Sequence, residues 1–241
     1  MLPAALACCF AAALLSGCAS PDRHAPPGPA DALAATPGEW HAVPLPGKAH
    51  TRYSWAHKEG RSALLAQSAR SASMFRRHVQ VEPQALRDVS FSWWVQDLIK
   101  DANVADADHA DAPARVLFGF AGDVARLPMR TRVLFELAEA LTGEKPPYAT
   151  LVYVWDAQAP VGSVIVNARS DRIRKIVVDS GPGQLRRWRE HRRDLAADFL
   201  LAFGEAPGAL TSIAVMTDSD NTRSNATSWY GPVALHPRAQ P

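Results

Sequence analysis

The stretch that decides the fold lies near the C-terminus and reads Ser212-Ile213-Ala214-Val215-Met216-Thr217-Asp218-Ser219-Asp220-Asn221-Thr222. Its first half is an apolar run of β-strand type, and this run ends abruptly at two acids and an amide. A second apolar run over 228–235 follows the polar turn and predicts a closing strand. Because short apolar runs and polar turns alternate along most of the chain, the sequence predicts a protein built mainly from β-strands.

Further strands are predicted wherever this alternation recurs. They are expected over 51–55, 62–68, 73–81, 88–95, 115–120, 150–155, 163–166, 173–178 and 212–217. The segment 186–193 reads as a strand or as irregular structure, because as a helix it would be basic nearly all round. The Asp-rich segment 101–113 predicts a loop.

Two short helices are expected between these strands. Helical spacing over 130–142 puts the apolar residues on one side and places Gly143 where a left-handed C-cap residue belongs. A second helix over 195–203 has Asp194 as its N-cap and Gly204 as its stop. About ten strands and two helices without β-α-β alternation favour a mainly β fold, an antiparallel β-sandwich.

The N-terminus carries the features of an export signal. Residues 1–17 are apolar, uncharged and too few to span a bilayer, which is typical of a secretory signal, although no Lys or Arg follows Met1. The ending Leu15-Ser16-Gly17-Cys18 resembles the lipobox of bacterial lipoproteins, in which the Cys is acylated; an ordinary signal cut elsewhere is the alternative. We therefore expect lipid on Cys18, a flexible tether over 18–38 and a single β-sandwich domain over 39–237.

Composition limits the location and the partners. Ala19 follows the Cys, where Asp would resemble an inner-membrane retention signal, so we expect an outer-membrane lipoprotein that faces the periplasm or the cell surface. Cys8 and Cys9 would leave with the signal and Cys18 would carry lipid, so no disulfide is expected. The formal net charge of +2 is too small to indicate nucleic acid as a partner.

The acids of the C-terminal turn are candidate metal ligands. Asp218, Asp220 and Asn221 offer closely spaced oxygen atoms of the kind that Ca²⁺ binds, whereas no other cofactor is expected. The alternative is a turn whose Asp and Asn side chains satisfy local backbone N–H groups, and the usual composition of turns favours it. A second acidic cluster has the composition of a solvated loop and comprises Asp106, Asp108, His109 and Asp111.

Aromatic residues supply the candidate ligand-binding surface. Trp93 and Trp94 are adjacent on a predicted strand and must point to opposite faces, so one of them needs a cover, an interface or a ligand. Flat aromatics beside polar groups at strand ends suit sugars, which selects Trp94, Trp155, Asp156, Arg115 and Trp229. The alternative is that large aromatics fill the core of the sandwich and that Arg115 makes a local ion pair.

A basic run over 186–193 is interrupted by Trp188. It could meet acidic polysaccharide, lipopolysaccharide phosphates or nucleic acid. The alternative is a solvated sheet edge whose charges discourage strand-to-strand association, and we prefer this reading.

The chain also resembles a known family from Trp40 onward. Matching segments occur in the expected order over 45–48, 114–116, 151–156, 160–162, 171–173, 177–181, 193–195, 203–205 and 214–222. The block Met216-Thr217-Asp218-Ser219-Asp220-Asn221-Thr222 is the most specific of these and is similar to that of domain-of-unknown-function family 3047. The family consists of secreted bacterial proteins, and the resemblance implies a jelly roll similar to carbohydrate-binding modules. It implies no established activity, cofactor or catalytic residue.

No catalytic signature accompanies these candidates. The sequence has no Gly-x-Ser-x-Gly elbow, no His-Glu-x-x-His pair and no glycine-rich phosphate loop. The favoured interpretation is a non-catalytic, lipid-anchored envelope module that binds a glycan or another envelope component on one face of the sandwich. One alternative is an enzyme that acts on polysaccharide or cell-wall material. The other is a structural or assembly lipoprotein whose partner is a protein.

Overall fold

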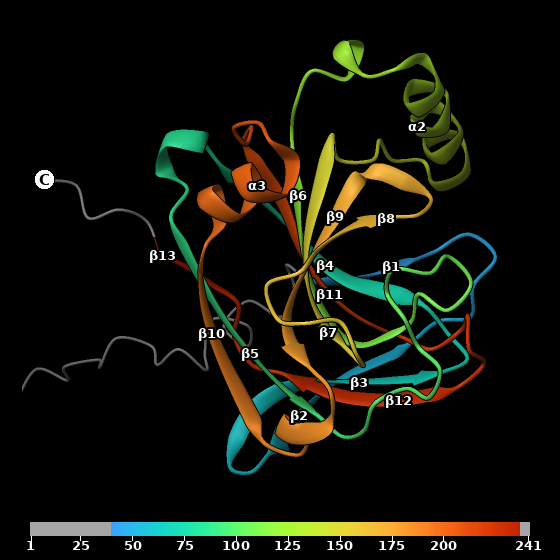
Figure 1. Cartoon of the computed structure of the whole chain (residues 1–241), viewed down its shortest axis with the longest axis vertical. Helices are drawn as coiled ribbons and strands as arrows, with labels where there is room; N and C mark the ends of the chain where they lie inside the picture. The colour runs from blue at the N-terminus through green and yellow to red at the C-terminus, as the bar shows by residue number, and fades with distance from the viewer. Residues whose placement is uncertain (1–39, 237–241) are drawn as a thin grey trace, which may run out of the picture.

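The computed structural model describes residues 40–236, and two packed β-sheets make up most of this part of the chain (Figure 1). The expected signal over 1–17, the lipid on Cys18 and the tether over 18–38 lie outside the described residues. Among residues 40–236, no helix has both the length and the apolar composition needed to cross a membrane.

The first sheet has seven strands. In spatial order they are β1 (His41–Pro44), β4 (Ser73–Val81), β11 (Leu210–Asp218), β6 (Ala112–Phe120), β7 (Ala149–Asp156), β9 (Ser170–Ser180) and β8 (Val164–Asn167). Neighbouring strands are antiparallel except for the parallel pair β7 and β9. The predicted sandwich is therefore confirmed, with one parallel pair that the sequence pattern did not indicate.

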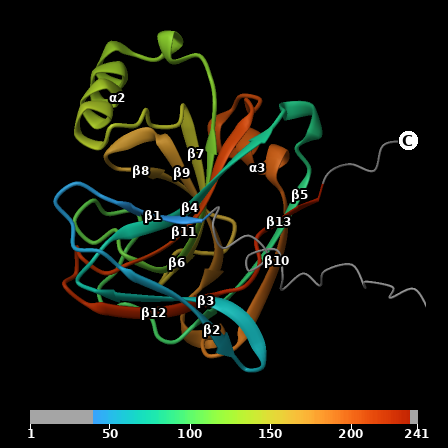
Figure 2. The same ribbon diagram turned by 180° about the vertical axis from the view of Figure 1, so that it is seen from behind.

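The second sheet has six strands. They are β10 (Trp188–Asp194), β5 (Asp88–Val95), β12 (Asn225–Tyr230), β3 (Arg61–Ala69) and β2 (Arg52–Lys58) in spatial order, with β13 (Ala234–His236) paired to β5. Figure 2 shows β2, β3 and β12 of this sheet from behind.

The single closing strand predicted over 228–235 is wrong, because the segment forms two strands. Tyr230 is the last residue of β12, and Gly231 and Pro232 separate it from β13. Pro232 has no N–H to donate to a neighbouring strand. A Cβ atom at Gly231 would collide with the Ser92 side chain, so the chain passes β5 closely at this point.

One core lies between the two sheets. Its largest fully buried side chains come from both of them and include Trp93, Trp155, Tyr153, Tyr230, Phe91 and Phe118. Tyr230 also joins the sheets by a hydrogen bond, because its hydroxyl donates to the Met216 carbonyl oxygen of β11 at 2.6 Å. The alternation of side chains along each strand explains why one face of each sheet supplies this core.

Helix α3 (Leu195–Phe203) begins and ends where the sequence predicts. The Asp194 carboxylate accepts a hydrogen bond from Ala197 N at 2.9 Å, and Gly204 adopts the left-handed conformation with φ 72°. Phe199 and Leu195 pack into the core. Three short 3₁₀ helices complete the connections and cover Pro83–Ala85, Val124–Arg126 and Pro182–Gln184.

Helix α2 (Met129–Thr142) also forms as predicted, with Gly143 as its left-handed C-cap at φ 76°. Its apolar side is largely exposed, since Val133, Leu137 and Leu141 retain 52%, 53% and 63% of their accessible surface. The helix lies at one end of the molecule in both views (Figure 1 and Figure 2). Periodicity therefore identified the helix but not its environment.

The basic segment over 186–193 forms the edge strand β10, and part of its charge faces inward. Arg189 Nε lies 3.0 Å from Asp179 Oδ1, and His191 Nε2 lies 2.8 Å from Asp179 Oδ2. Arg193 makes two hydrogen bonds to Asp198, of 2.7 and 2.8 Å. The expected solvated edge therefore describes only part of this strand, because alternate residues neutralise buried acids.

Candidate functional site

A pocket of about 440 Å³ lies on the face of the seven-stranded sheet that points away from the core. Strands β4, β6, β7, β9 and β11 form its floor. Its walls come from several connections. They include the loop before β6, the turn between β8 and β9, and the segment from α2 to β7 that carries Phe135 and Pro147. The connection after β1 adds Leu45 and Lys48, and the turn after β11 adds Asp220 and Asn221. Loops therefore cover part of the outer face of the seven-stranded sheet, and the pocket lies between these loops and the strands.

Strand alternation explains which side chains reach this pocket. On β11, Ile213 and Val215 face the core, whereas Ala214 and Met216 line the pocket. Gly119 of β6 lines it as well, and a Cβ atom there would collide with Pro147. The absence of a side chain at this glycine allows Pro147 to approach the sheet.

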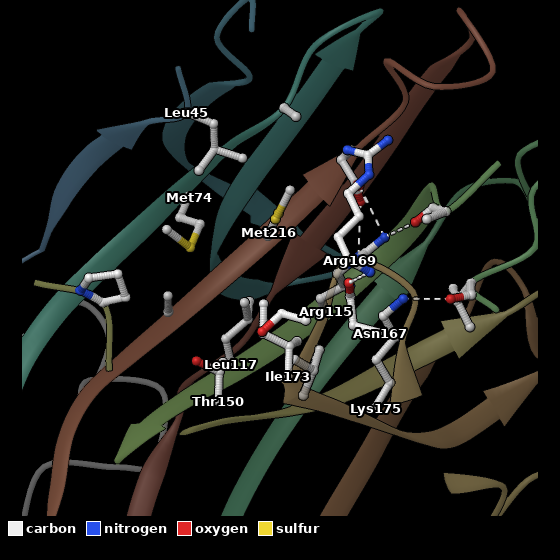
Figure 3. Close-up of a pocket in the computed structure, with 18 of the residues that line it drawn as sticks. Leu45, Met74, Arg115, Leu117, Thr150, Asn167, Arg169, Ile173, Lys175 and Met216 are labelled. Atoms are coloured by element: carbon white, nitrogen blue, oxygen red, sulfur yellow. Dashed lines mark hydrogen bonds and ion pairs between the residues drawn. The ribbon is translucent and has the colours of Figure 1, made fainter. Parts of the chain in front are cut away.

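The pocket has a polar end and an apolar end. Figure 3 shows Arg115, Asn167, Arg169 and Lys175 gathered at one end, with Leu45, Met74 and Leu117 toward the other. Met216 lies between the two groups. Such a division is typical of sites that hold an amphipathic ligand, in which a few polar groups orient an otherwise apolar molecule.

Arg115 and Asp218 form a buried ion pair at the polar end. Arg115 Nε lies 3.0 Å from Asp218 Oδ1, and its Nη2 donates to Asp218 Oδ2 at 3.0 Å and to the Ala110 carbonyl oxygen. Burial raises the pKa of Asp218 to about 6, although the Arg115 charge opposes this shift. Arg115 therefore makes an ion pair, but its partner is Asp218, 103 positions along the chain, rather than an acid of the adjacent loop. Arg115 also lines the pocket.

The other acids of the C-terminal turn have partners too. Asp220 pairs with Lys48, and Asp111 accepts hydrogen bonds from Asn221 N at 3.1 Å and from Thr222 N at 2.7 Å. Asp111, Asp218 and Asp220 offer carboxylate oxygens within 4.8 Å of one another. The Asn221 amide is directed elsewhere and donates to the Ala107 carbonyl oxygen at 2.9 Å. These side chains hold the turn against neighbouring segments, but the carboxylate that accepts from its backbone N–H groups is that of the distant Asp111 rather than an acid of the turn itself.

Lys175 is the most deeply buried of the charged pocket residues that sequence reasoning missed. It lies within β9, is only 1% exposed, and its ammonium donates to the Val104 carbonyl oxygen. Burial lowers the pKa of Lys175 to about 8, and the charge of Arg115 adds to this effect. The available signal was a lysine whose neighbours two positions away on the predicted strand, Ile173 and Val177, are apolar. Such a position is expected to be buried, and a buried lysine is uncommon outside functional sites.

The predicted tryptophans lie away from the pocket. Trp94 and Trp229 meet edge to face on the second sheet with their centroids 4.9 Å apart, and Lys58 Nζ lies 3.6 Å from the Trp94 centroid. Trp155 is fully buried, and its Nε1 donates to the Gly181 carbonyl oxygen at 3.1 Å. Asp156 is buried and accepts from Val104 N at 3.1 Å. Of the five predicted ligand-binding residues, Arg115 alone lines the pocket.

Comparison with known proteins gives a family. A family model described as "Protein of unknown function (DUF3047)" matches residues 38–234. No curated protein matches the chain.

Several solved structures are similar in fold. The family 11 carbohydrate-binding module of the cellulase Lic26A-Cel5E of Clostridium thermocellum has a TM-score of 0.41 and 8% identity, over 84% of this chain and 90% of that one. The xyloglucanase domain of NopAA from Sinorhizobium fredii has a TM-score of 0.42 and 6% identity, over 83% and 93%. The K1 adhesin domain of Lys-gingipain from Porphyromonas gingivalis W83 has a TM-score of 0.37 and 10% identity, over 84% and 93%. At these TM-scores, the similarity carries no argument about function.

Proposed function

This chain belongs to the family described as "Protein of unknown function (DUF3047)", and we propose from its pocket that it is a binding module for a small component of the cell envelope. The observation that carries the proposal is the pocket itself. Its volume of about 440 Å³ is in the range of small-molecule sites, and a few polar groups converge at one end of an apolar surface.

The wall chemistry supports a ligand other than a sugar. Sugar rings stack on flat aromatic side chains, whereas Phe135 is the one aromatic among the described residues that line this pocket, and the other apolar lining residues are aliphatic or methionine. The aromatic pair of Trp94 and Trp229 is covered by Lys58, which lies over both rings. Of the two ligand classes expected from the sequence, a glycan and another envelope component, the pocket supports the second.

The partners of the acids in the pocket wall argue against the alternative of an enzyme that acts on polysaccharide or cell-wall material. Asp218 pairs with Arg115, Asp220 pairs with Lys48, and Asp106 lies 2.9 Å from His109 Nδ1. A glycoside hydrolase needs one carboxylic acid and one carboxylate that both face the substrate. Since each acid that lines the pocket has a basic partner, the arrangement favours binding over hydrolysis.

A structural role with a protein partner is the second candidate. The exposed apolar side of α2 supports it, because a row of exposed leucines on one helix is typical of a contact surface. Such a role would leave the buried polar end of the pocket unexplained, so we place it second.

We further propose that lipid on Cys18 holds the module at the outer membrane, where it faces the periplasm or the cell surface. In cells, Cys18→Ala is expected to abolish palmitate incorporation and to release the protein from the membrane fraction. Cys9→Ala lies within the proposed signal and should change neither result. Continued lipid labelling of Cys18→Ala would refute the anchor.

Binding itself is tested on the soluble chain from residue 39 onward. This part contains every described strand and the whole described core, so cooperative unfolding is checked first. Leu117→Trp fills the pocket, whereas Ala125→Trp places the same side chain at an exposed position outside it. Native mass spectrometry after incubation with an envelope extract should show a bound small molecule with the wild type and with Ala125→Trp, but not with Leu117→Trp. Equal occupancy of a folded Leu117→Trp variant would refute the proposal.

A further inference from the structure

The polar end of the pocket has an excess of positive charge. Six basic side chains line the pocket, and four of them have carboxylate partners: Lys48, Arg76, Arg115 and Arg172. The other two donate to backbone carbonyl oxygens, Arg169 to Ala107 and Lys175 to Val104. Within residues 40–236, neither of these two makes an ion pair with an acid. The chain as a whole is nearly neutral, so this excess is a local property of the site.

Lys175 has unused capacity for hydrogen bonds. A lysine ammonium offers three N–H donors, and the Val104 carbonyl oxygen takes one of them. The residue is almost completely removed from water, and a buried charge without a counter-ion is unfavourable. An anionic group that enters the pocket would supply both the missing acceptors and the missing charge.

The apolar end fits a flexible chain. Leu117, Met74 and Met216 line it together with Pro147. Methionine side chains are unbranched and polarizable, so they adapt to alkyl groups of different shapes. No tryptophan lines the pocket, although the described chain contains several.

We infer that the pocket binds an anionic amphiphile, with a carboxylate or phosphate group at Lys175 and Arg169 and an alkyl chain along Met74, Met216 and Leu117. This inference rests on the proposed binding function and specifies the chemical class of its ligand. One molecule can carry both the charged group and the chain, because the cationic and apolar ends open into the same cavity (Figure 3).

Isothermal titration calorimetry of the soluble chain from residue 39 with matched probes tests whether the ligand is an anionic amphiphile. Decanoate and decyl phosphate carry the two candidate anions, 1-decanol has no charge, and decyltrimethylammonium has the opposite charge. Acetate and inorganic phosphate carry the anion without the chain. We expect binding of decanoate, decyl phosphate or both, with affinity at least about tenfold above that of decanol. The stronger of the two anionic probes identifies the headgroup.

Chain length provides a second readout. Each methylene that enters an apolar site contributes a constant increment, so affinity should rise by up to about fourfold per methylene from octanoate to decanoate. Acetate should bind too weakly to compete. Equal affinities of acetate and decanoate would show that the site takes a free anion, and this would overturn the inference.

Variants test whether Lys175 binds the anionic headgroup. Lys175→Met keeps an apolar stem and removes the ammonium, and it should weaken the preferred anionic probe by at least about tenfold while changing decanol by less than about twofold. Lys100→Met removes an exposed lysine outside the pocket and should change nothing. Thermal melting confirms that both variants are folded.

The affinity for the anion should also fall progressively above pH 8, as Lys175 loses its proton. Arg115 of β6, Asp156 of β7 and Asp218 of β11 are the other charged groups that act on it. Of these, Asp218 has its pKa near 6 and is already ionised in this pH range, so its titration does not mimic the effect.

The outcomes separate this inference from the proposed function. Any of three results would overturn the inference. The first is equal binding of decanoate and decanol, and the second is full retention of decanoate binding by Lys175→Met. The third is no binding of any anionic probe. The proposed function would survive the last result if another ligand bound to the wild type and not to Leu117→Trp. It would fail if no ligand were sensitive to Leu117→Trp.

Discussion

Lys175 illustrates how one side chain can oppose stability and still be retained. Its buried ammonium has one carbonyl oxygen as hydrogen-bond partner, and Arg115, Asp218 and Asp156 are the charged groups that act on it. A hydrophobic residue of similar length would fill the same space without the loss of hydration. Sites that bind ligands commonly contain such residues, because the interaction that is missing in the free protein is the one the ligand provides.

Replacement of Lys175 should therefore stabilise the free protein. Its pKa of about 8 lies below the usual 10.5, so at pH 7 the folded state holds this proton less strongly than the unfolded state does. Wild-type stability should rise as the pH increases from 8 to 10.5, because the folded state loses the proton first. Lys175→Met should remove this dependence and raise the free energy of unfolding at pH 7 by up to about 3 kcal/mol.

Urea unfolding of both proteins at pH 7 and pH 10 measures this difference. A variant that is less stable than the wild type at pH 7 would contradict the expectation.

Asp179 should contribute stability in the opposite way. Burial alone raises the pKa of Asp179, but hydrogen bonds from His191 and Trp93, together with Arg189, lower it overall. The folded state favours the ionised form of Asp179. The carboxylate therefore contributes to the free energy of unfolding above its unfolded pKa near 4, and this contribution is lost as the pH falls below that value toward the lower folded pKa. Asp179→Asn should cost about 2–4 kcal/mol at pH 7 and clearly less at pH 3.

Urea unfolding at the two pH values tests this. Asp97→Asn is the control, since the ion pair of Asp97 with Arg186 is exposed on both sides and should change stability by less than about 0.5 kcal/mol. An equal loss for Asp179→Asn at both pH values would exclude ionisation as the cause.

At the scale of the element, α2 and α3 have similar sequence signals and different environments. Both end at a glycine in the left-handed conformation, and both have an apolar side. The apolar side of α3 packs into the core, whereas that of α2 is exposed. Helix α2 therefore contributes little to the core in the monomer.

Substitution on α2 should leave stability almost unchanged. Leu137→Gln replaces an exposed leucine by a residue of good helix propensity, so the free energy of unfolding should change by less than about 0.5 kcal/mol. Phe199→Ala on α3 is the matched control and should cost about 3–5 kcal/mol, because Phe199 is fully buried. A loss above about 1.5 kcal/mol for Leu137→Gln, measured by urea unfolding, would mean that α2 is packed in solution.

The turn from β11 to β12 should not depend on calcium. Arg115 and Lys48 already neutralise Asp218 and Asp220, and Asp111 is engaged by backbone N–H groups of the turn. The melting temperature should therefore be the same in millimolar Ca²⁺ and in EDTA. An increase in Ca²⁺ that disappears in Asp220→Asn would establish a metal site at the three acids.

At the scale of the molecule, the two sheets should unfold together. A single core contains side chains from both, and the Tyr230 hydroxyl bonds to the backbone of β11 across it. We expect thermal transitions followed by tryptophan fluorescence and by far-ultraviolet circular dichroism to coincide. Two separate transitions would show that the sheets are independent units.

The fold could be predicted from the sequence because its signals are local. The bounds of β4, β5 and α3 follow from side-chain alternation, apolar spacing and caps, and the structure reproduces them. The pocket could not be predicted, because five strands and several connections from distant parts of the chain create it. Arg115 was found by its charge at a strand start, whereas Lys175 and the covered Trp94 depend on neighbours that no local pattern specifies.

The position of β11 also determines when the protein can complete its fold. This strand inserts between β4 and β6, yet it is made long after both of them. Until residue 218 is available, the edges of β4 and β6 that later face β11 have no partner, and unpaired edges invite wrong pairing. The first sheet therefore closes after most of the chain has been synthesised rather than during synthesis. This delay would suit the export that we propose for the chain, because a chain crosses a membrane before it folds.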